Sequence, residues 1–263
     1  MEGLLGAGKI ALVFIIGFPL LMYLAQDSLI FHPQPLPEAQ RASIAQRASV
    51  ESLFMDAADG TRLHAWHARG KPGASLVMYF GGNAEQVSWM LDDAARRTPE
   101  ASWLLVDYRG YGSSGGSPSE KALTGDALRW YDQLSSQYPK IHVFGRSLGS
   151  GVAVHLAAQR PVAGVILVAP FDSLVEVGKR HYPFLPVNLM LKHRFDSVAL
   201  APKITAPLLC IVAAGDQIIP AEHSKRLYDA WGGEKRWVGL DGADHNSTDG
   251  AANYWPSIVA FLK

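Results

Sequence analysis

The sequence predicts an α/β fold in which helices cover both faces of a mostly parallel sheet. Short apolar runs alternate with stretches of helical periodicity along most of the chain. Several polar residues directly follow predicted strands, which is where ligands gather in open parallel sheets. Roughly 230 residues remain after an apolar N-terminal segment, enough for one domain with a sizeable core. We therefore expect a single folded domain over residues 28–263.

The predicted elements begin with a hydrophobic helix near the N-terminus. Residues 49–55 and 61–68 then form a strand hairpin across the turn Asp59-Gly60. The other predicted strands are short apolar runs, and they span residues 75–80, 102–107, 141–144, 162–168, 207–213 and 235–240. The run Ser117-Pro118-Ser119-Glu120 has the residue types of a capping box with proline at the first helical position, so a helix should begin there.

The run Gly145-Arg146-Ser147-Leu148-Gly149 lies between the strand 141–144 and a helical pattern over 150–158. A tight turn at such a junction holds a serine hydroxyl at the N-terminus of the helix, where free N–H groups favour a developing anion. Glycines on both sides of the serine prevent collisions within the turn. The run predicts a nucleophile elbow with Ser147 as nucleophile. The alternative is a glycine-rich turn that only lets the helix pack closely on the sheet.

A serine nucleophile needs an imidazole to accept its proton and a carboxylate to orient that imidazole. Asp216 lies just past the predicted strand 207–213, and His245 lies just past the strand 235–240. Both side chains should therefore reach the same edge of the sheet as Ser147. We predict that these three residues form a catalytic triad.

Two other residues are alternatives within this triad. His223 also follows the strand 207–213 but would lie in the next helix. Asp172 follows the strand 162–168 and could supply the carboxylate from a neighbouring strand end. Arg146 could pair with a carboxylate such as Asp172. We expect Asp107 to hold a structural loop rather than to belong to a site.

A tetrahedral intermediate needs two N–H donors directed at its oxyanion. The backbone N–H of Leu148, next to the nucleophile, is the expected first donor. The strand 75–80 is followed at once by Gly81-Gly82-Asn83-Ala84 and by a helical pattern over 85–97. Because the glycines let the backbone approach a substrate closely, we predict that the N–H of Asn83 is the second donor.

These motifs give the chain a resemblance to the α/β-hydrolase superfamily, whose triad residues follow the same order of serine, acid and histidine. Within it the chain is similar to a membrane-anchored branch that includes alpha/beta hydrolase domain proteins acting as protein depalmitoylases. The segments that carry the resemblance are Phe31-His32-Pro33, Asp59-Gly60-Thr61-Arg62-Leu63, Gly82-Asn83-Ala84, 107–115, 145–150 and Pro170-Phe171-Asp172-Ser173. Gly81 departs from the branch, because many members carry histidine there, and this concerns the rigidity of the loop more than its chemistry. The resemblance implies the α/β-hydrolase fold and an acyl-enzyme route that needs no cofactor.

The N-terminal residues 3–25 are apolar except for Lys9, and as a helix they would extend about 34 Å, enough to cross a bilayer core. An Ala-x-Ala-like cleavage site is missing, which favours a retained membrane anchor over 1–27 rather than a cleaved signal peptide. The position of Lys9 favours a catalytic domain on the non-cytoplasmic side of the membrane. We expect the segment to tether the enzyme without contributing to its chemistry.

Residues 174–202 form an insertion between the strands that precede Asp172 and Asp216, and we expect a small cap there. An apolar cap over the serine would favour an acyl chain, and the alternative is a helix that merely packs on the domain. Basic and acidic residues number 24 each, so no strong field favours a nucleic-acid partner. The single cysteine, Cys210, is expected to be a core residue.

We therefore predict a membrane-tethered serine hydrolase that cleaves the ester or thioester bond of a small or lipid-like acyl substrate. A peptidase or amidase is an alternative, because the same groups cleave amides if the histidine protonates the leaving amine. A non-catalytic membrane scaffold with the same fold is a second alternative. No metal or cofactor is expected.

Overall fold

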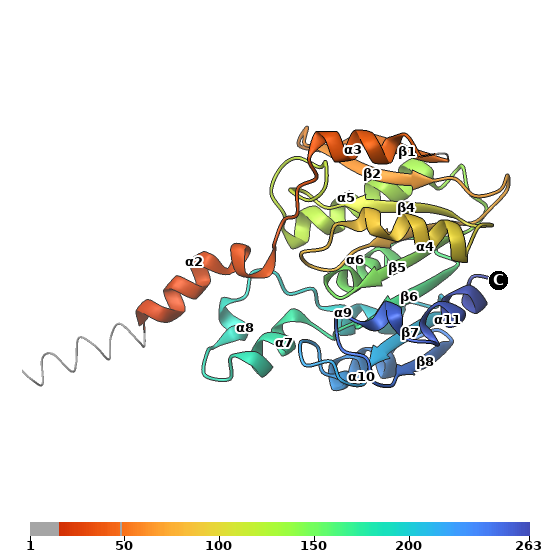
Figure 1. Cartoon of the computed structure of the whole chain (residues 1–263). Helices are drawn as coiled ribbons and strands as arrows, with labels where there is room; N and C mark the ends of the chain where they lie inside the picture. Colours follow the sequence, from red (N-terminus) through yellow and green to blue (C-terminus); the bar gives the residue numbers. More distant parts are fainter. Residues whose placement is uncertain (1–15, 48) are drawn as a thin grey trace, which may run out of the picture.

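An eight-stranded sheet with the order β1-β2-β4-β3-β5-β6-β7-β8 forms the centre of the computed structural model (Figure 1). The structure describes residues 16–47 and 49–263. β2 is antiparallel to both of its neighbours, and the remaining strand pairs are parallel. The predicted α/β fold with a mostly parallel sheet is confirmed.

Each strand begins and ends within two residues of its predicted range. The strands are β1 (Val50–Asp56), β2 (Arg62–Ala68), β3 (Leu76–Phe80), β4 (Ser102–Asp107), β5 (Ile141–Arg146), β6 (Gly164–Val168), β7 (Leu208–Ala213) and β8 (Lys235–Leu240). The helices are α2 (Phe18–Ile30), α3 (Glu38–Ala45), η2 (Val87–Trp89), α4 (Met90–Arg97), α5 (Glu120–Leu134), α6 (Leu148–Ala157), α7 (Leu174–His181), α8 (Val187–Met190), α9 (Ser197–Leu200), η3 (Ala201–Lys203), α10 (Ala221–Ala230), η4 (Thr248–Gly250) and α11 (Tyr254–Phe261).

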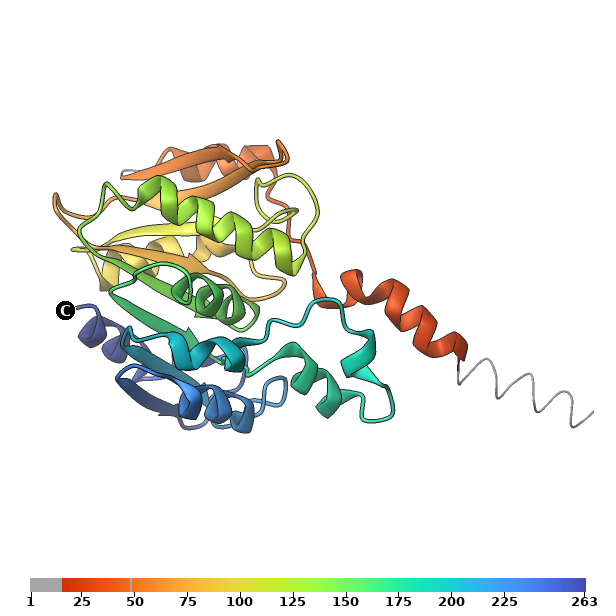
Figure 2. The same ribbon diagram turned by 180° about the vertical axis from the view of Figure 1, so that it is seen from behind.

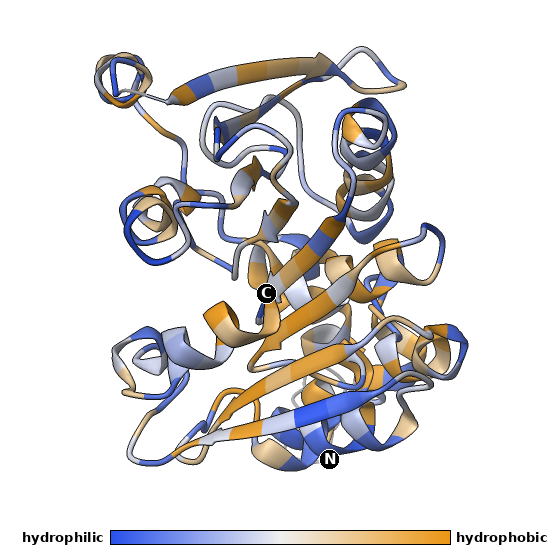
Figure 3. Ribbon diagram, turned by 90° about the vertical axis from the view of Figure 1, so that its right-hand side faces the viewer, coloured by the Kyte–Doolittle hydropathy of each residue, from blue (hydrophilic) through white to orange (hydrophobic). Residues whose placement is uncertain are grey.

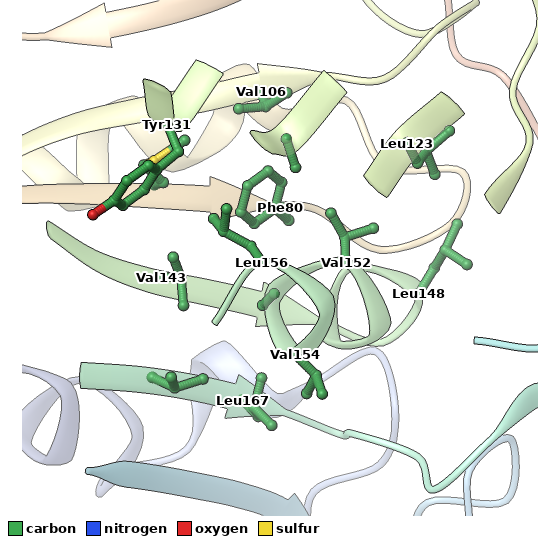
Figure 4. Close-up of a cluster of buried hydrophobic side chains, with 14 of the residues drawn as sticks. Phe80, Val106, Leu123, Tyr131, Val143, Leu148, Val152, Val154, Leu156 and Leu167 are labelled. Atoms are coloured by element: carbon green, nitrogen blue, oxygen red, sulfur yellow. The ribbon is translucent and has the colours of Figure 1, made fainter. Parts of the chain in front are cut away.

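Two hydrophobic clusters, one on each face of the sheet, hold the helices. Along β3, Leu76, Met78 and Phe80 belong to one cluster, while Val77 and Tyr79 belong to the other. The first cluster includes side chains of α5, α6 and α10, and the second includes side chains of α4 and α11. Figure 4 shows the first cluster between the sheet and α6, and Figure 3 shows that the central strands are mainly hydrophobic. Strands covered on both faces are typically apolar throughout, which explains why the sequence predicts them well.

Helix α5 begins two residues later than the predicted capping box. Its N-cap is Ser119, whose Oγ accepts a hydrogen bond from the N–H of Ala122 at 3.1 Å. The carboxylate of Glu120 accepts hydrogen bonds from the N–H groups of Arg194 and Phe195 at 2.7 and 2.9 Å. Glu120, which was predicted to complete a capping box, instead joins the segment after α8 to the N-terminus of α5.

The insertion between β6 and β7 contains α7, α8 and α9, and we call residues 174–194 the cap. Figures 1 and 2 place α7 and α8 beside α2 at one end of the molecule. Residues 1–15 of the predicted anchor over 1–27 lie outside the described residues, and α2 continues to Ile30. No helix within residues 16–47 and 49–263 is both long enough and apolar enough to cross a bilayer.

Acidification should destabilise the fold through His142 of β5, whose ring is 7% exposed and packs against Phe261. Burial, together with the charge of Lys140, lowers the pKa of His142 to about 4. The unfolded chain, with a histidine pKa of about 6.5, therefore binds this proton more readily. The stability that neutral His142 contributes is complete above pH 6.5 and is lost as the pH falls towards 4, by on the order of 3 kcal/mol in all.

Thermal unfolding at pH 7 and pH 5 measures this effect. We expect the unfolding midpoint of the wild type to fall more between these pH values than that of His142→Leu, which has no proton to bind at this position. Equal decreases in the two proteins would contradict the assignment.

Candidate active site

Ser147 occupies the turn between β5 and α6 with φ of 49° and ψ of −118°. This backbone conformation costs about 1–3 kcal/mol for a residue other than glycine and is common where function requires it. A Cβ atom at position 145 would lie 2.3 Å from the carbonyl oxygen of Gly149, and one at position 149 would lie 2.0 Å from that of Phe80. Both glycines are therefore required for the turn, which has the strained, closely packed geometry of a nucleophile elbow.

The structure brings Ser147, His245 and Asp216 together at the carboxyl edge of the sheet. The distance from Ser147 Oγ to His245 Nε2 is 3.0 Å, and from His245 Nδ1 to Asp216 Oδ2 it is 2.7 Å. The other oxygen of Asp216 accepts hydrogen bonds from the N–H groups of Ile218 and Ile219 at 2.9 and 2.7 Å. All three side chains are buried. In this arrangement the carboxylate can orient the imidazole, and the imidazole can accept the proton of the hydroxyl.

The two alternatives, Asp172 and His223, lie together in a separate cluster. Asp172 Oδ1 is 2.8 Å from His223 Nδ1, and its other oxygen accepts a hydrogen bond from Arg226. Burial alone would raise the pKa of Asp172, but the bonds from His223 and Arg226 lower it below its ordinary value. Each of these groups already has a charged or polar partner, and neither bonds to Ser147 or His245.

Arg146 pairs with a carboxylate as expected, but the partner is Glu85 and not the suggested Asp172. Arg146 Nη1 lies 3.1 Å from Glu85 Oε2, and its Nη2 donates to the carbonyl oxygen of His245 at 3.0 Å. Glu85 Oε2 also accepts the N–H of Gly82 at 2.6 Å. The buried Glu85–Arg146 pair therefore joins three parts of the site: the loop after β3, the elbow and the loop that carries His245. Glu85 was expected to begin the helical pattern over 85–97, but the first helical turn, η2, begins at Val87, so Glu85 belongs to the loop, where its carboxylate reaches Arg146.

The loop after β3, residues 81–85, is tied down at several points. Tyr108 donates its hydroxyl proton to the carbonyl oxygen of Gly81 at 2.9 Å. The side-chain oxygen of Asn83 accepts hydrogen bonds from the N–H of His32 and the hydroxyl of Tyr111 at 2.9 and 2.8 Å. These bonds hold the loop although position 81 is a glycine.

The two predicted oxyanion donors are placed as follows. Leu148 is the first residue of α6, and the N–H groups of the first helical turn have no acceptor within the helix. Within the described part of the chain, the N–H of Asn83 has no hydrogen-bond acceptor, and the contacts with His32 and Tyr111 are made by the side chain of Asn83. Their role as an oxyanion hole stays a prediction.

Arg146→Lys should lower kcat by on the order of 10- to 100-fold while changing KM little, because small displacements of catalytic groups are costly. A lysine ammonium lacks the planar fork that reaches Glu85 and the His245 carbonyl together. Arg109→Lys is the matched control, since Arg109 forms a similarly buried ion pair with Asp126 but lies outside the site. Both kcat and the thermal unfolding midpoint are measured for each variant. Equal losses of kcat in the two variants would show that Arg146 acts through stability alone.

A cavity of about 290 Å³ extends from Ser147 between α2 and the cap. Small-molecule pockets are typically about 300–1,000 Å³, so this volume is at the lower end of that range. Its lining is mainly apolar and includes Met22, Tyr23, Leu29, Ile30, Phe171, Leu174, Val177, Leu185, Val187, Met190, Leu191, Ile218 and Ile219. The N-terminal segment therefore forms one wall of the cavity through α2, while the expectation that it contributes nothing to the chemistry stays a prediction.

A second hydrogen-bonded series of serine, histidine and aspartate lies on β1, β2 and β4, at the end of the strand order opposite to β7 and β8. Ser52 Oγ is 2.8 Å from His64 Nε2, and His64 Nδ1 is 2.6 Å from Asp107 Oδ2. Asp107 also accepts the N–H of Ser113 at 2.9 Å, so it holds the loop after β4 as predicted. Ser52 lies within the regular strand β1 and not in a strained turn before a helix. Among the described residues, no cluster of three or more His, Cys, Asp or Glu side chains could hold a metal ion.

A mostly parallel sheet, a strained serine turn before a helix, and acid and histidine loops after later strands together define an α/β-hydrolase. The serine hydrolase family model matches residues 120–263. The chain is also 38% identical over 251 residues to the uncharacterized protein Rv2307c of Mycobacterium tuberculosis, covering 91% of this chain and 88% of that protein. The chain therefore belongs to the serine hydrolase family, and it is a hydrolase.

Other relatives support the alpha/beta hydrolase domain branch. The uncharacterized membrane protein YNL320W of Saccharomyces cerevisiae is 31% identical, covering 81% of this chain and 79% of that protein. The alpha/beta hydrolase domain-containing protein 17B of Xenopus tropicalis is 27% identical, covering 84% and 77%. The solved structure of the Pyrococcus furiosus esterase Pf2001 superposes with a TM-score of 0.67 at 15% identity, covering 89% of this chain and 98% of that one, which shows the common fold.

Proposed function

We propose that this serine hydrolase cleaves carboxylic ester or thioester bonds of acyl substrates through Ser147, His245 and Asp216. The observation that carries the proposal is the continuous hydrogen-bonded chain from Asp216 to Ser147, whose hydroxyl faces an apolar cavity. Apolar pockets with few polar groups favour apolar ligands, and the polar groups fix which bond is presented. An acyl chain in the cavity would place its carbonyl carbon next to Ser147.

In the proposed mechanism, Ser147 Oγ attacks the carbonyl carbon while His245 Nε2 takes the hydroxyl proton. The N–H groups of Leu148 and Asn83 stabilise the negative charge on the carbonyl oxygen. His245 then gives its proton to the leaving alcohol or thiol, and the acyl group remains on Ser147. A water molecule, activated by His245, attacks the acyl-enzyme and releases the free acid.

Membrane tethering by the N-terminal segment is the second part of the proposal. It rests on the apolar composition of residues 3–25, and one relative is named a membrane protein. Residues 28–263 would then form the hydrolase domain, on the non-cytoplasmic side if Lys9 sets the orientation. Because Met22, Tyr23 and Gln26 of α2 line the cavity, the C-terminal part of such a tether would also form part of the cavity wall.

A panel of soluble acyl esters, acyl thioesters and aminoacyl amides tests the reaction class. We expect turnover of esters and thioesters, with kcat/KM rising from short to medium acyl chains as the cavity fills. Amide cleavage at a comparable kcat/KM would favour the peptidase alternative. Absence of turnover, together with absence of labelling by a fluorophosphonate probe, would favour the non-catalytic scaffold.

A further inference from the structure

Exposed apolar side chains are concentrated at one end of the molecule. Among the described residues, twelve large hydrophobic side chains are exposed, and ten of them lie in residues 16–29 or 182–189. The ten are Ile16, Phe18, Leu20, Leu21, Tyr23, Leu24, Leu29, Tyr182, Phe184 and Leu189. Single exposed apolar residues are ordinary, but contiguous groups of them mark interaction sites. We call the surface formed by Phe18, Phe184 and Leu189 the docking face, in which the rings of Phe18 and Phe184 lie 6.4 Å apart.

The two parts of the docking face are fastened to each other. The buried side chain of Gln26 in α2 accepts the N–H of Lys192 at 2.7 Å and donates to the carbonyl oxygen of Met190 at 3.3 Å. The next residue, Asp27, pairs with His193 Nε2 at 2.9 Å. Figures 1 and 2 both show α2, α7 and α8 side by side, extending from the same end of the sheet. Phe18 of α2 and Tyr182 of the cap both pack near Phe184, with ring centroids 6.4 Å apart in each pair, so exposed apolar side chains of α2 and the cap belong to one surface.

The charge around this surface is positive although the whole chain is neutral. The cap carries four basic residues, Lys179, Arg180, Lys192 and Arg194, and one acidic residue, Glu176, and α2 adds the acidic Asp27, so basic residues exceed acidic ones by two. Exposed apolar side chains surrounded by basic groups are typical of surfaces that bind anionic lipids, because the apolar groups enter the bilayer and the basic groups contact the headgroups.

The cavity reaches the surface at the same place. Tyr23 of α2 and Tyr182 of the cap both line the cavity, and they are 39% and 42% exposed. Ligand entering between them would pass along exposed apolar side chains and reach Ser147 at the inner end. An acyl chain of a bilayer lipid would move along this path from one apolar environment into another, without exposing its apolar surface to water on the way.

We propose that the docking face binds the surface of an anionic bilayer and that the cavity takes up an acyl chain from that bilayer. The uptake rests on the proposed function, but the docking does not. A tether within residues 1–27 would bring the protein to a membrane, and because its last part belongs to α2, which is fastened to the cap by Gln26 and Asp27, it would bring the docking face close to the lipid. The docking face fixes the orientation, with the cavity mouth against the lipid.

An environment-sensitive fluorophore on a single introduced cysteine measures this orientation in the full chain. Leu189→Cys places the dye on the docking face, and Lys140→Cys places it before β5, at the opposite edge of the sheet. Both are made with Ser147→Ala, so that no turnover occurs. The native Cys210 is buried, and burial raises the pKa of its thiol, so it should not be labelled. Each protein is mixed with phosphatidylcholine vesicles with and without phosphatidylglycerol.

We expect a blue shift and increased emission at position 189, larger with phosphatidylglycerol, and no change at position 140. Arg180→Glu with Lys192→Glu should weaken the partitioning seen at position 189 by about tenfold or more, because each basic residue near an anionic surface contributes to binding. Lys203→Glu with Lys121→Glu changes the net charge equally outside the cap and should have little effect. No change at position 189, equal changes at 189 and 140, or equal effects of the two charge pairs would overturn the proposal.

Rates separate the docking from the proposed reaction. Phe184→Ser with Leu189→Ser should lower the hydrolysis of an acyl ester embedded in vesicles while leaving that of a soluble short-chain ester unchanged, since neither side chain lines the cavity. Equal rates on both substrates would contradict uptake from the bilayer. If the dye at position 189 reports insertion into lipid but the wild type hydrolyses neither ester, the proposed reaction is contradicted and the docking proposal is not.

Discussion

Ser147→Ala is expected to abolish labelling by a fluorophosphonate probe and to lower kcat by on the order of 10⁶. The alanine removes the oxygen that attacks the carbonyl carbon, and His245 then has no hydroxyl to activate. The loss should be almost entirely in kcat, because the apolar walls of the cavity, which bind the acyl chain, are unchanged. Labelling is read on a gel, and kcat is measured with a soluble ester.

Ser52→Ala provides a matched control, because Ser52 makes the same kind of contact with a histidine that is paired to an aspartate. Hydrogen bonding alone does not make a serine a nucleophile. Ser147 also stands in a strained turn at the start of α6 and lines the cavity together with Asn83, and Ser52 has neither feature. We expect full labelling and nearly unchanged kcat for Ser52→Ala. Loss of labelling in that variant, with labelling retained by Ser147→Ala, would reverse the assignment.

The strands and the catalytic edge were predictable because they depend on local patterns. Both faces of β3 and β7 are buried, so each of these strands is an unbroken apolar run, and a glycine-containing loop follows it. Since parallel strands end at one edge, the positions of Ser147, Asp216 and His245 along the chain were enough to predict that they lie together.

The supporting contacts were not predictable in this way, because they join residues far apart in the sequence. Glu85 and Arg146 are separated by 61 positions, and Gln26 and Lys192 by 166. No local pattern indicates such partners, and a glutamate after a glycine-rich loop has the composition of a helix start. The contact of α2 with the cavity was not predictable for the same reason. An apolar segment indicates burial in lipid or in protein, but it does not indicate which part of the protein the segment packs against.

Asp216→Asn should lower kcat by about 10⁴, because an asparagine amide can donate to His245 Nδ1 and so favour the tautomer that cannot accept the serine proton. The asparagine oxygen can still accept the N–H groups of Ile218 and Ile219, so the loop after β7 should keep its conformation. The variant therefore tests the charge and tautomer rather than the fold.

Asp172→Asn distinguishes the two aspartates, since Asp172 pairs with His223 and Arg226 and has no contact with His245. Breaking a buried ion pair leaves a charge without its partner, so the thermal midpoint of this variant should fall while its kcat changes little. Asp216→Asn should show the opposite pattern, with a large loss of kcat and a small change in the midpoint. If the loss of kcat were larger for Asp172→Asn, the carboxylate that serves His245 during turnover would have to come from the end of β6, and the hydrogen bond between Asp216 and His245 would have only a structural role.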